Sequence, residues 1–138
     1  MSARFFLDTN VFVYSFDSGA KAVRANDLIR KAISSRNGVV SFQVVQEFMN
    51  VALRRFANPM TVSDAEQYLG TVFRPLLAIH SSQALYGEAL RLKGRYSFSW
   101  YDSLVVAAAA ESECSILYSE DMQHGFQIRS LQIHNPFL

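Results

Sequence analysis

The chain has 138 residues and a mass of 15.6 kDa, and 50% of its residues are hydrophobic. This length predicts a single domain over residues 1–138, and this composition excludes disorder over most of the chain. The formal net charge is only +1, but ten of the 13 basic residues are arginine, which suits phosphate recognition. The longest apolar run, residues 104–110, is too short to cross a membrane, and the amino end lacks the apolar stretch of a secretory signal. We therefore expect a cytoplasmic protein.

The first third of the chain predicts two strands with a helix between them. Residues 4–8 form a short apolar run that stops at the carboxylate of Asp8, and residues 38–41 form a second apolar run. Between these runs, residues 20–35 carry apolar side chains at a spacing close to one helical face. Two buried strands joined by a helix indicate a parallel pair with a crossover connection.

The middle of the chain predicts two helices and a short strand. Residues 42–56 form an amphipathic helix whose polar stripe includes Glu47. Residues 61–72 predict the next helix, because Thr61 stands at capping-box spacing from an aspartate. Residues 75–80 predict a short strand.

The last third of the chain continues the alternation of helices and strands. A helix opens at residues 81–82 and continues through Leu92, and residues 99–110 predict a helix that is apolar on every face. Residues 115–119 and 131–134 predict the last two strands. This alternation predicts an α/β fold, a three-layer α/β/α sandwich around a mainly parallel central sheet with right-handed crossovers.

Four acidic residues are candidates for a functional site. Open parallel sheets bind ligands beyond the carboxyl ends of their strands, which is where Asp8 and Asp121 stand. Asp102 lies in the first turn of the apolar helix, and Glu47 lies in a polar stripe. Each of these acids also has a structural explanation. Asp8 and Asp121 could be turn formers or N-caps, and Asp102 could be the capping partner of Ser99. Glu47 could lie on a solvated helix face. Position alone leaves both interpretations open.

Taken as a set, the four acids indicate metal-dependent phosphate chemistry. Clustered carboxylates raise each other's pKa, so a site that keeps several of them ionised needs a hard cation such as Mg²⁺ or Mn²⁺. Such a cation suits phosphodiester hydrolysis, because it leaves positions open for water and phosphate oxygens. Outside the four acids the chain carries 13 basic and eight acidic residues, and this positive balance suits a polyanionic substrate.

Four segments resemble, in order and spacing, the four acidic motifs of the PIN domain family, and the chain as a whole is similar to a VapC-type toxin ribonuclease. The segments are residues 7–11, 45–48, 101–109 and 117–122. The resemblance implies that the catalytic and metal-binding residues are Asp8, Glu47, Asp102 and Asp121. It also implies polar support from Thr9, Asn10 and Ser119. Of the adjacent acids Glu120 and Asp121, we expect Asp121 to face the metal.

The resemblance further implies what the protein does and what it binds. It implies a Mg²⁺- or Mn²⁺-dependent endoribonuclease in which a metal-activated water attacks an RNA phosphodiester, with 5′-phosphate and 3′-hydroxyl products. It also implies pairing with a small antitoxin protein in a type II toxin–antitoxin system, and a homodimer.

Two other functions compete with this interpretation. A haloacid-dehalogenase-like phosphohydrolase also places an aspartate after its first strand, but its motif resembles Asp-x-Asp, whereas here Asn10 stands where an acid/base aspartate is needed. A catalytically silent PIN-like module that binds RNA or protein is the other alternative, and acids at all four motif positions argue against it.

Overall fold

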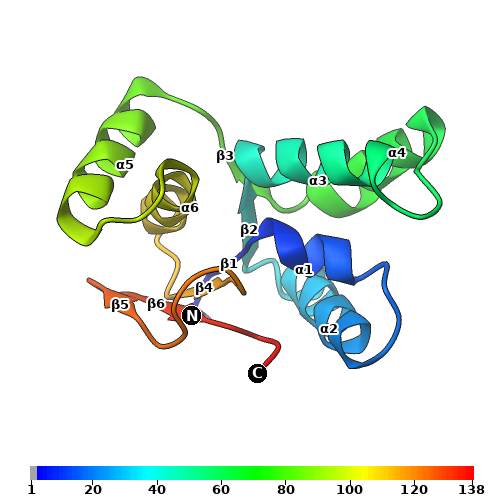
Figure 1. Cartoon of the computed structure of the whole chain (residues 1–138), viewed down its shortest axis with the longest axis horizontal. Helices are drawn as coiled ribbons and strands as arrows, with labels where there is room; N and C mark the ends of the chain where they lie inside the picture. The colour runs from blue at the N-terminus through cyan, green and yellow to red at the C-terminus, as the bar shows by residue number, and fades with distance from the viewer. Residues whose placement is uncertain (1–2) are drawn as a thin grey trace.

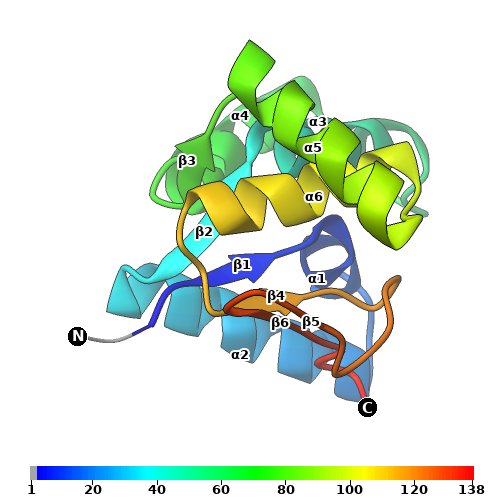
Figure 2. The same cartoon turned by 90° about the vertical axis from the view of Figure 1, so that its left-hand side faces the viewer.

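A computed structural model describes residues 3–138 and shows a six-stranded sheet with helices on both faces (Figures 1 and 2). The strands are β1 (Phe5–Leu7), β2 (Gly38–Ser41), β3 (Leu77–Ile79), β4 (Ile116–Tyr118), β5 (Gln127–Ile128) and β6 (Leu131–His134). The helices are α1 (Thr9–Tyr14), α2 (Ala20–Ser35), α3 (Phe42–Arg54), α4 (Val62–Tyr68), the π-helix η1 (Leu69–Phe73), α5 (Gln83–Tyr96) and α6 (Trp100–Glu111). None of the helices within residues 3–138 combines the length and hydrophobicity needed to span a bilayer.

The sheet is parallel except at one edge. Its strand order is β3-β2-β1-β4-β6-β5, and only the β5–β6 pair is antiparallel. Figure 2 shows α2 below the sheet and both α5 and α6 above it. Every residue of β1 and β2 is buried, as expected for parallel strands covered on both faces. The predicted three-layer α/β/α class is therefore confirmed.

The strand order reverses between β1 and β4. The chain adds β2 and β3 on one side of β1 and then returns to place β4 on its other side, with Leu7 opposite Tyr118. The Asp8 N–H donates to the Tyr118 carbonyl oxygen at 3.0 Å, which extends this pairing one residue beyond β1. The carboxyl ends of β1 and β4 thus lie side by side at the switch point, where open α/β sheets bind their ligands.

An aromatic cluster positions α1 against α3. Phe12 of α1 lies 4.9 Å from Phe73, measured between ring centroids, and Phe48 of α3 stacks on Tyr68 at 4.9 Å. Phe12, Phe48 and Phe73 have no exposed surface. Burial of such rings stabilises the fold by about 2–3 kcal/mol each relative to exposure. Because α1 and α3 start next to the ends of β1 and β2, this packing sets the distance between their amino-terminal halves.

The structure differs from the sequence-based expectations in a few elements. The predicted helix over residues 61–72 is divided into α4 and η1, where the Arg74 N–H donates to the Leu69 carbonyl oxygen in the wider π-helical pattern. The predicted helix over residues 42–56 ends at Arg54. Neither α1 nor the two-residue edge strand β5 was predicted from the sequence.

Candidate active site

A cavity of about 550 Å³ lies at the carboxyl ends of β1 and β4. Its lining residues are Asp8, Gln43, Gln46, Glu47, Asn50, Tyr101, Asp102, Val105 and Asp121. The four predicted acids come from the end of β1, the polar side of α3, the first turn of α6 and the segment after β4. The structure therefore brings all four to one cavity.

Asp8 is the most buried of the four acids, with 6% of its surface exposed. It is the N-cap of α1, and its Oδ1 accepts a hydrogen bond from the Thr9 N–H at 2.7 Å. Its Oδ2 accepts a hydrogen bond from the Ser119 hydroxyl at 2.8 Å. Burial raises the pKa of Asp8 to about 6, against the lowering effect of these two bonds, and the nearby charges of Glu47 and Asp121 raise it further. Asp8 therefore both caps α1 and lines the cavity, so its interpretation as an N-cap and its interpretation as a site residue do not exclude each other.

Glu47 is held by donors on both of its carboxylate oxygens. The Thr9 hydroxyl donates to Oε2 at 3.2 Å, and the Gln43 side-chain amide donates to Oε1 at 2.7 Å. The same amide nitrogen of Gln43 also donates to the Tyr101 carbonyl oxygen at 3.3 Å. Glu47 is exposed, as its position in the polar stripe predicted, and it also lines the cavity.

Gln43 is a site residue that the sequence analysis missed. It is 5% exposed, although its place in the polar stripe of α3 indicated a solvated side chain. Both partners of its amide nitrogen are acceptors, which determines the orientation of the amide group. The available signal was its position four residues before Glu47, one helical turn away on the same face.

Asp102 enters the cavity from the first turn of α6. Its N–H donates to the hydroxyl of Ser99, the N-cap residue, at 3.1 Å. Burial raises the pKa of the Asp102 carboxyl, the Ser99 hydrogen bond lowers it, and the charges of Asp121 and Glu47 raise it. Asp102 and Asp8 thus both experience the field of other acids of the set.

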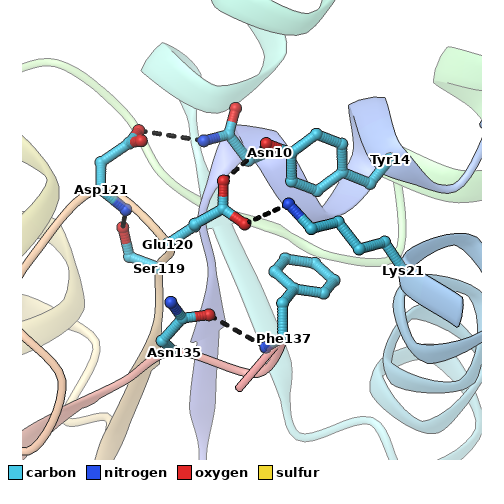
Figure 3. A network of polar contacts seen from close by, with 8 residues as sticks. All are labelled: Asn10, Tyr14, Lys21, Ser119, Glu120, Asp121, Asn135 and Phe137. Carbon is cyan, nitrogen blue, oxygen red and sulfur yellow. Dashed lines mark hydrogen bonds and ion pairs between the residues drawn. The ribbon is translucent and has the colours of Figure 1, made fainter.

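Asp121 is linked to the rest of the site by two polar side chains. Its Oδ2 accepts a hydrogen bond from the Asn10 amide at 3.0 Å, and its N–H donates to the Ser119 hydroxyl oxygen at 3.3 Å. The Ser119 hydroxyl, which also donates to Asp8, therefore bridges the two acids that follow β1 and β4. Figure 3 shows Asp121 between these two partners.

Glu120, the neighbour of Asp121, is turned toward α1 and α2 (Figure 3). It accepts hydrogen bonds from the Tyr14 hydroxyl and the Lys21 ammonium group. The Tyr14 bond, followed by the Lys21 bond, lowers the pKa of Glu120 below its ordinary value. Asp121 lines the cavity, and Glu120 is not among the lining residues.

Within residues 3–138, no basic side chain forms an ion pair with any of the four acids of the cavity. Every ion pair found within residues 3–138 uses another acid, namely Glu120, Asp27 or Glu88. The carboxylate oxygens of these acids, together with the side-chain amides of Gln46 and Asn50 among the lining residues, are of the chemical type that a hard divalent cation such as Mg²⁺ or Mn²⁺ prefers as ligands. In the described part of the chain no three histidine, cysteine, aspartate or glutamate side chains are gathered closely enough to hold an ion, so the acids are distributed around the cavity.

Comparison with known proteins agrees with this architecture. The profile of the PIN domain family matches residues 5–126. A search of proteins with curated functions found no significant match. Among solved structures, a toxin–antitoxin complex from Klebsiella pneumoniae is 18% identical, with a TM-score of 0.68 and coverage of 99% of this chain and 98% of that chain.

Two further solved structures share the fold. VapC20 of Mycobacterium tuberculosis, described as a sarcin-ricin loop cleaving toxin, is 21% identical, with a TM-score of 0.63 and coverage of 83% of this chain and 88% of that chain. FitAB bound to an IR36 DNA fragment is 17% identical, with a TM-score of 0.69 and coverage of 97% and 96%. At these identities the likeness shows a common fold. The family profile covers most of the chain, so the predicted family is confirmed, and the chain belongs to the PIN domain family.

Proposed function

We propose that this PIN-domain protein is a Mg²⁺- or Mn²⁺-dependent endoribonuclease of the VapC type, and the toxin of a type II toxin–antitoxin pair. The observation that carries the proposal is the meeting of four acids from four separate segments at one cavity, where none of them forms an ion pair with a basic side chain of the described residues. Membership of the PIN family supports a nuclease, and it argues against the haloacid-dehalogenase-like alternative.

In this proposal Asp8, Glu47, Asp102 and Asp121 are the catalytic residues and hold the cation through their carboxylate oxygens. A bound Mg²⁺ or Mn²⁺ would supply an activated water and would stabilise the negative charge that develops on the phosphate. Asp8 gains most from a positive charge in the cavity, because burial disfavours its ionised form.

Hydrogen-bond donors of the chain orient these carboxylates before any ligand arrives. The Thr9 hydroxyl donates to Glu47, and the Ser119 hydroxyl donates to Asp8. These bonds restrict the direction of the lone pairs that remain free on the two carboxylates. A carboxylate whose orientation is already restricted in this way loses less conformational entropy when it binds a cation.

The rim of the cavity offers groups that suit a single-stranded RNA. Tyr101 is 65% exposed beside the acids, and exposed aromatic rings stack on bases without strong sequence preference. Gln46 and Asn50, one turn apart on α3, present amide donors and acceptors on the same cavity. We propose that the nucleotides next to the scissile phosphate lie along these three residues.

The proposed partners follow from the solved relatives and from the surface. One structure of the same fold is a toxin–antitoxin complex and another is described as a sarcin-ricin loop cleaving toxin, which supports an antitoxin partner and an RNA substrate. Phe16, Leu53 and Leu69 expose 46%, 39% and 42% of their surfaces, and such apolar side chains suit contact with an antitoxin or with a second copy in a homodimer.

The test is cleavage of total RNA by purified protein with Mg²⁺ or Mn²⁺, with an EDTA control. Asp8→Asn should reduce cleavage to the EDTA background, because the variant loses a charged ligand. Asp27→Asn is the matched control, since Asp27 is an exposed aspartate paired with Arg30 at 3.0 Å. It should cleave like the wild type. Equal cleavage by Asp8→Asn and wild type would contradict the proposed site, and RNA binding without cleavage by any preparation would favour a silent binding module.

A further inference from the structure

Two adjacent acids after β4 point in different directions. Asp121 lines the cavity, whereas Glu120 turns toward α1 and the start of α2 (Figure 3). Since neighbouring residues share one short segment, an anchor on one of them restricts where the other can lie. The contacts of Glu120 therefore bear on the geometry of Asp121.

Glu120 belongs to a compact group that we call the Glu120 clamp, formed by Glu120, Tyr14, Lys21 and Phe137. The Tyr14 hydroxyl donates to Oε1 of Glu120 at 2.6 Å, and the Lys21 ammonium donates to Oε2 at 2.9 Å. The Lys21 nitrogen lies 4.6 Å from the ring centroid of Tyr14 and 5.7 Å from that of Phe137. The two rings meet edge to face at 5.1 Å. Both carboxylate oxygens of Glu120 are thus engaged by residues outside the cavity.

One face of α1 holds both acids. Asn10 and Tyr14 lie four residues apart on α1, so their side chains project on the same side, one turn from each other. The Asn10 amide donates a hydrogen bond to Asp121, and the Tyr14 hydroxyl donates one to Glu120, the residue that precedes Asp121 in the chain. The same short segment is also fixed at Ser119, whose N–H donates to the His134 carbonyl oxygen at 3.0 Å.

We propose that Glu120 is a positioning residue, which with Tyr14 and Lys21 anchors residues 119–121 on α1 and so holds the Asp121 carboxylate at the cavity for a divalent cation. The cation is part of the proposed function, so this inference rests on it. Asp121 is exposed and lies outside regular secondary structure. Without the clamp its side chain would lose more conformational freedom on binding, and the affinity for the cation would fall.

The experiment measures Mn²⁺ affinity at neutral pH from the spin-resonance signal of free Mn²⁺. Glu120→Ala should weaken Mn²⁺ binding about 10-fold, the range typical of residues that orient metal ligands. Tyr14→Phe, which removes one hydroxyl and keeps the ring, should weaken it less. Glu120→Gln, which keeps an acceptor for Tyr14, should recover part of the affinity lost in Glu120→Ala.

Glu88→Ala is the matched control. The side chain of Glu88 is 23% exposed and pairs with Arg91 and Arg129, and that of Glu120 is 24% exposed. Glu88 lies on α5, outside the cavity lining. Its loss should leave Mn²⁺ affinity unchanged, even if both variants lower the melting temperature.

A second readout needs no metal. Hydrogen exchange in EDTA should be faster over residues 117–122 in Glu120→Ala and Tyr14→Phe than in the wild type and in Glu88→Ala. Unchanged exchange, or equal Mn²⁺ affinity in wild type and clamp variants, would overturn the positioning role alone. Tighter Mn²⁺ binding in Tyr14→Phe would also overturn it, because a freed Glu120 would then be acting as a ligand. A wild-type protein that binds no Mn²⁺ would instead refute the proposed function.

Discussion

Replacing Asp8 by asparagine should stabilise the cation-free protein at neutral and alkaline pH. The Asp8 carboxyl is 6% exposed and has no basic side chain beside it among the ion pairs of residues 3–138. Asparagine has nearly the shape of a protonated aspartate. It keeps an acceptor for the Thr9 N–H and offers a donor to the Ser119 hydroxyl oxygen, so the fold around it should be retained.

The expected size of the effect follows from the pKa of Asp8. Burial raises this pKa from 3.8 to about 6. Because the folded-state pKa lies above the unfolded-state value, the stabilisation due to Asp8 is fully present below 3.8 and is lost as the pH rises through 6. With about 1.4 kcal/mol per pKa unit, ionisation of Asp8 should cost about 3 kcal/mol of folding free energy at about pH 8.

The assay is urea unfolding of wild type and Asp8→Asn in EDTA, followed by circular dichroism. At about pH 8 the variant should be more stable by up to about 3 kcal/mol, and the difference should become small at about pH 4. The difference between two proteins cancels the titration of the groups that they share. Asp27→Asn, at an exposed site, should show no such pH-dependent difference.

Two results would refute this reasoning. One is an Asp8→Asn variant no more stable than wild type at alkaline pH, and the other is a stability difference that does not change with pH. Addition of Mn²⁺ in place of EDTA should reduce the stability advantage of Asp8→Asn over wild type. A cation that binds only the folded wild type stabilises it by about 2.7 kcal/mol at a hundred times its Kd.

The other predictions concern packing and the polar support of the site. Gly38→Ala should destabilise the protein by about 1–3 kcal/mol or more in urea unfolding, because a Cβ there would overlap the side chain of Ala32 and lie 2.6 Å from its Cα. The same substitution at Gly94, where an added Cβ would have no atom within 4 Å, should instead stabilise α5 by about 0.5–1 kcal/mol. Equal effects of the two substitutions on stability would contradict the close packing of Gly38 against Ala32. Ser119→Ala should lower RNA cleavage about 10-fold while leaving the circular dichroism spectrum unchanged, because Asp8 loses the hydroxyl that orients it; full activity would show that this bond is dispensable.

Elements with a clear hydrophobic period were predictable from the sequence. The bounds of α2 and β2 coincide with the predicted residues 20–35 and 38–41, because each element carries its own local pattern and a defined end. The fold class followed from the order of such elements. The order and spacing of the four acidic motifs likewise indicated the family.

Elements that depend on their neighbours were not predictable. The helix α1 has six residues, too few to be stable alone, and several of them are β-branched or aromatic. It is stabilised by Phe12, which packs on Phe48 and Phe73. The two residues of β5 form a strand only because β6 pairs with them.

The same distinction applies to the site. The sequence could name four candidate acids, but the burial of Gln43 against Glu47 depends on how α3 packs beside α1 and α6. Of the two adjacent acids, Asp121 lines the cavity, whereas Glu120 accepts a hydrogen bond from Tyr14, which lies 106 residues before it in the chain. Local patterns determine which residues become helix or strand, whereas the direction of a side chain at a strand end is decided by partners that only the folded sheet brings near.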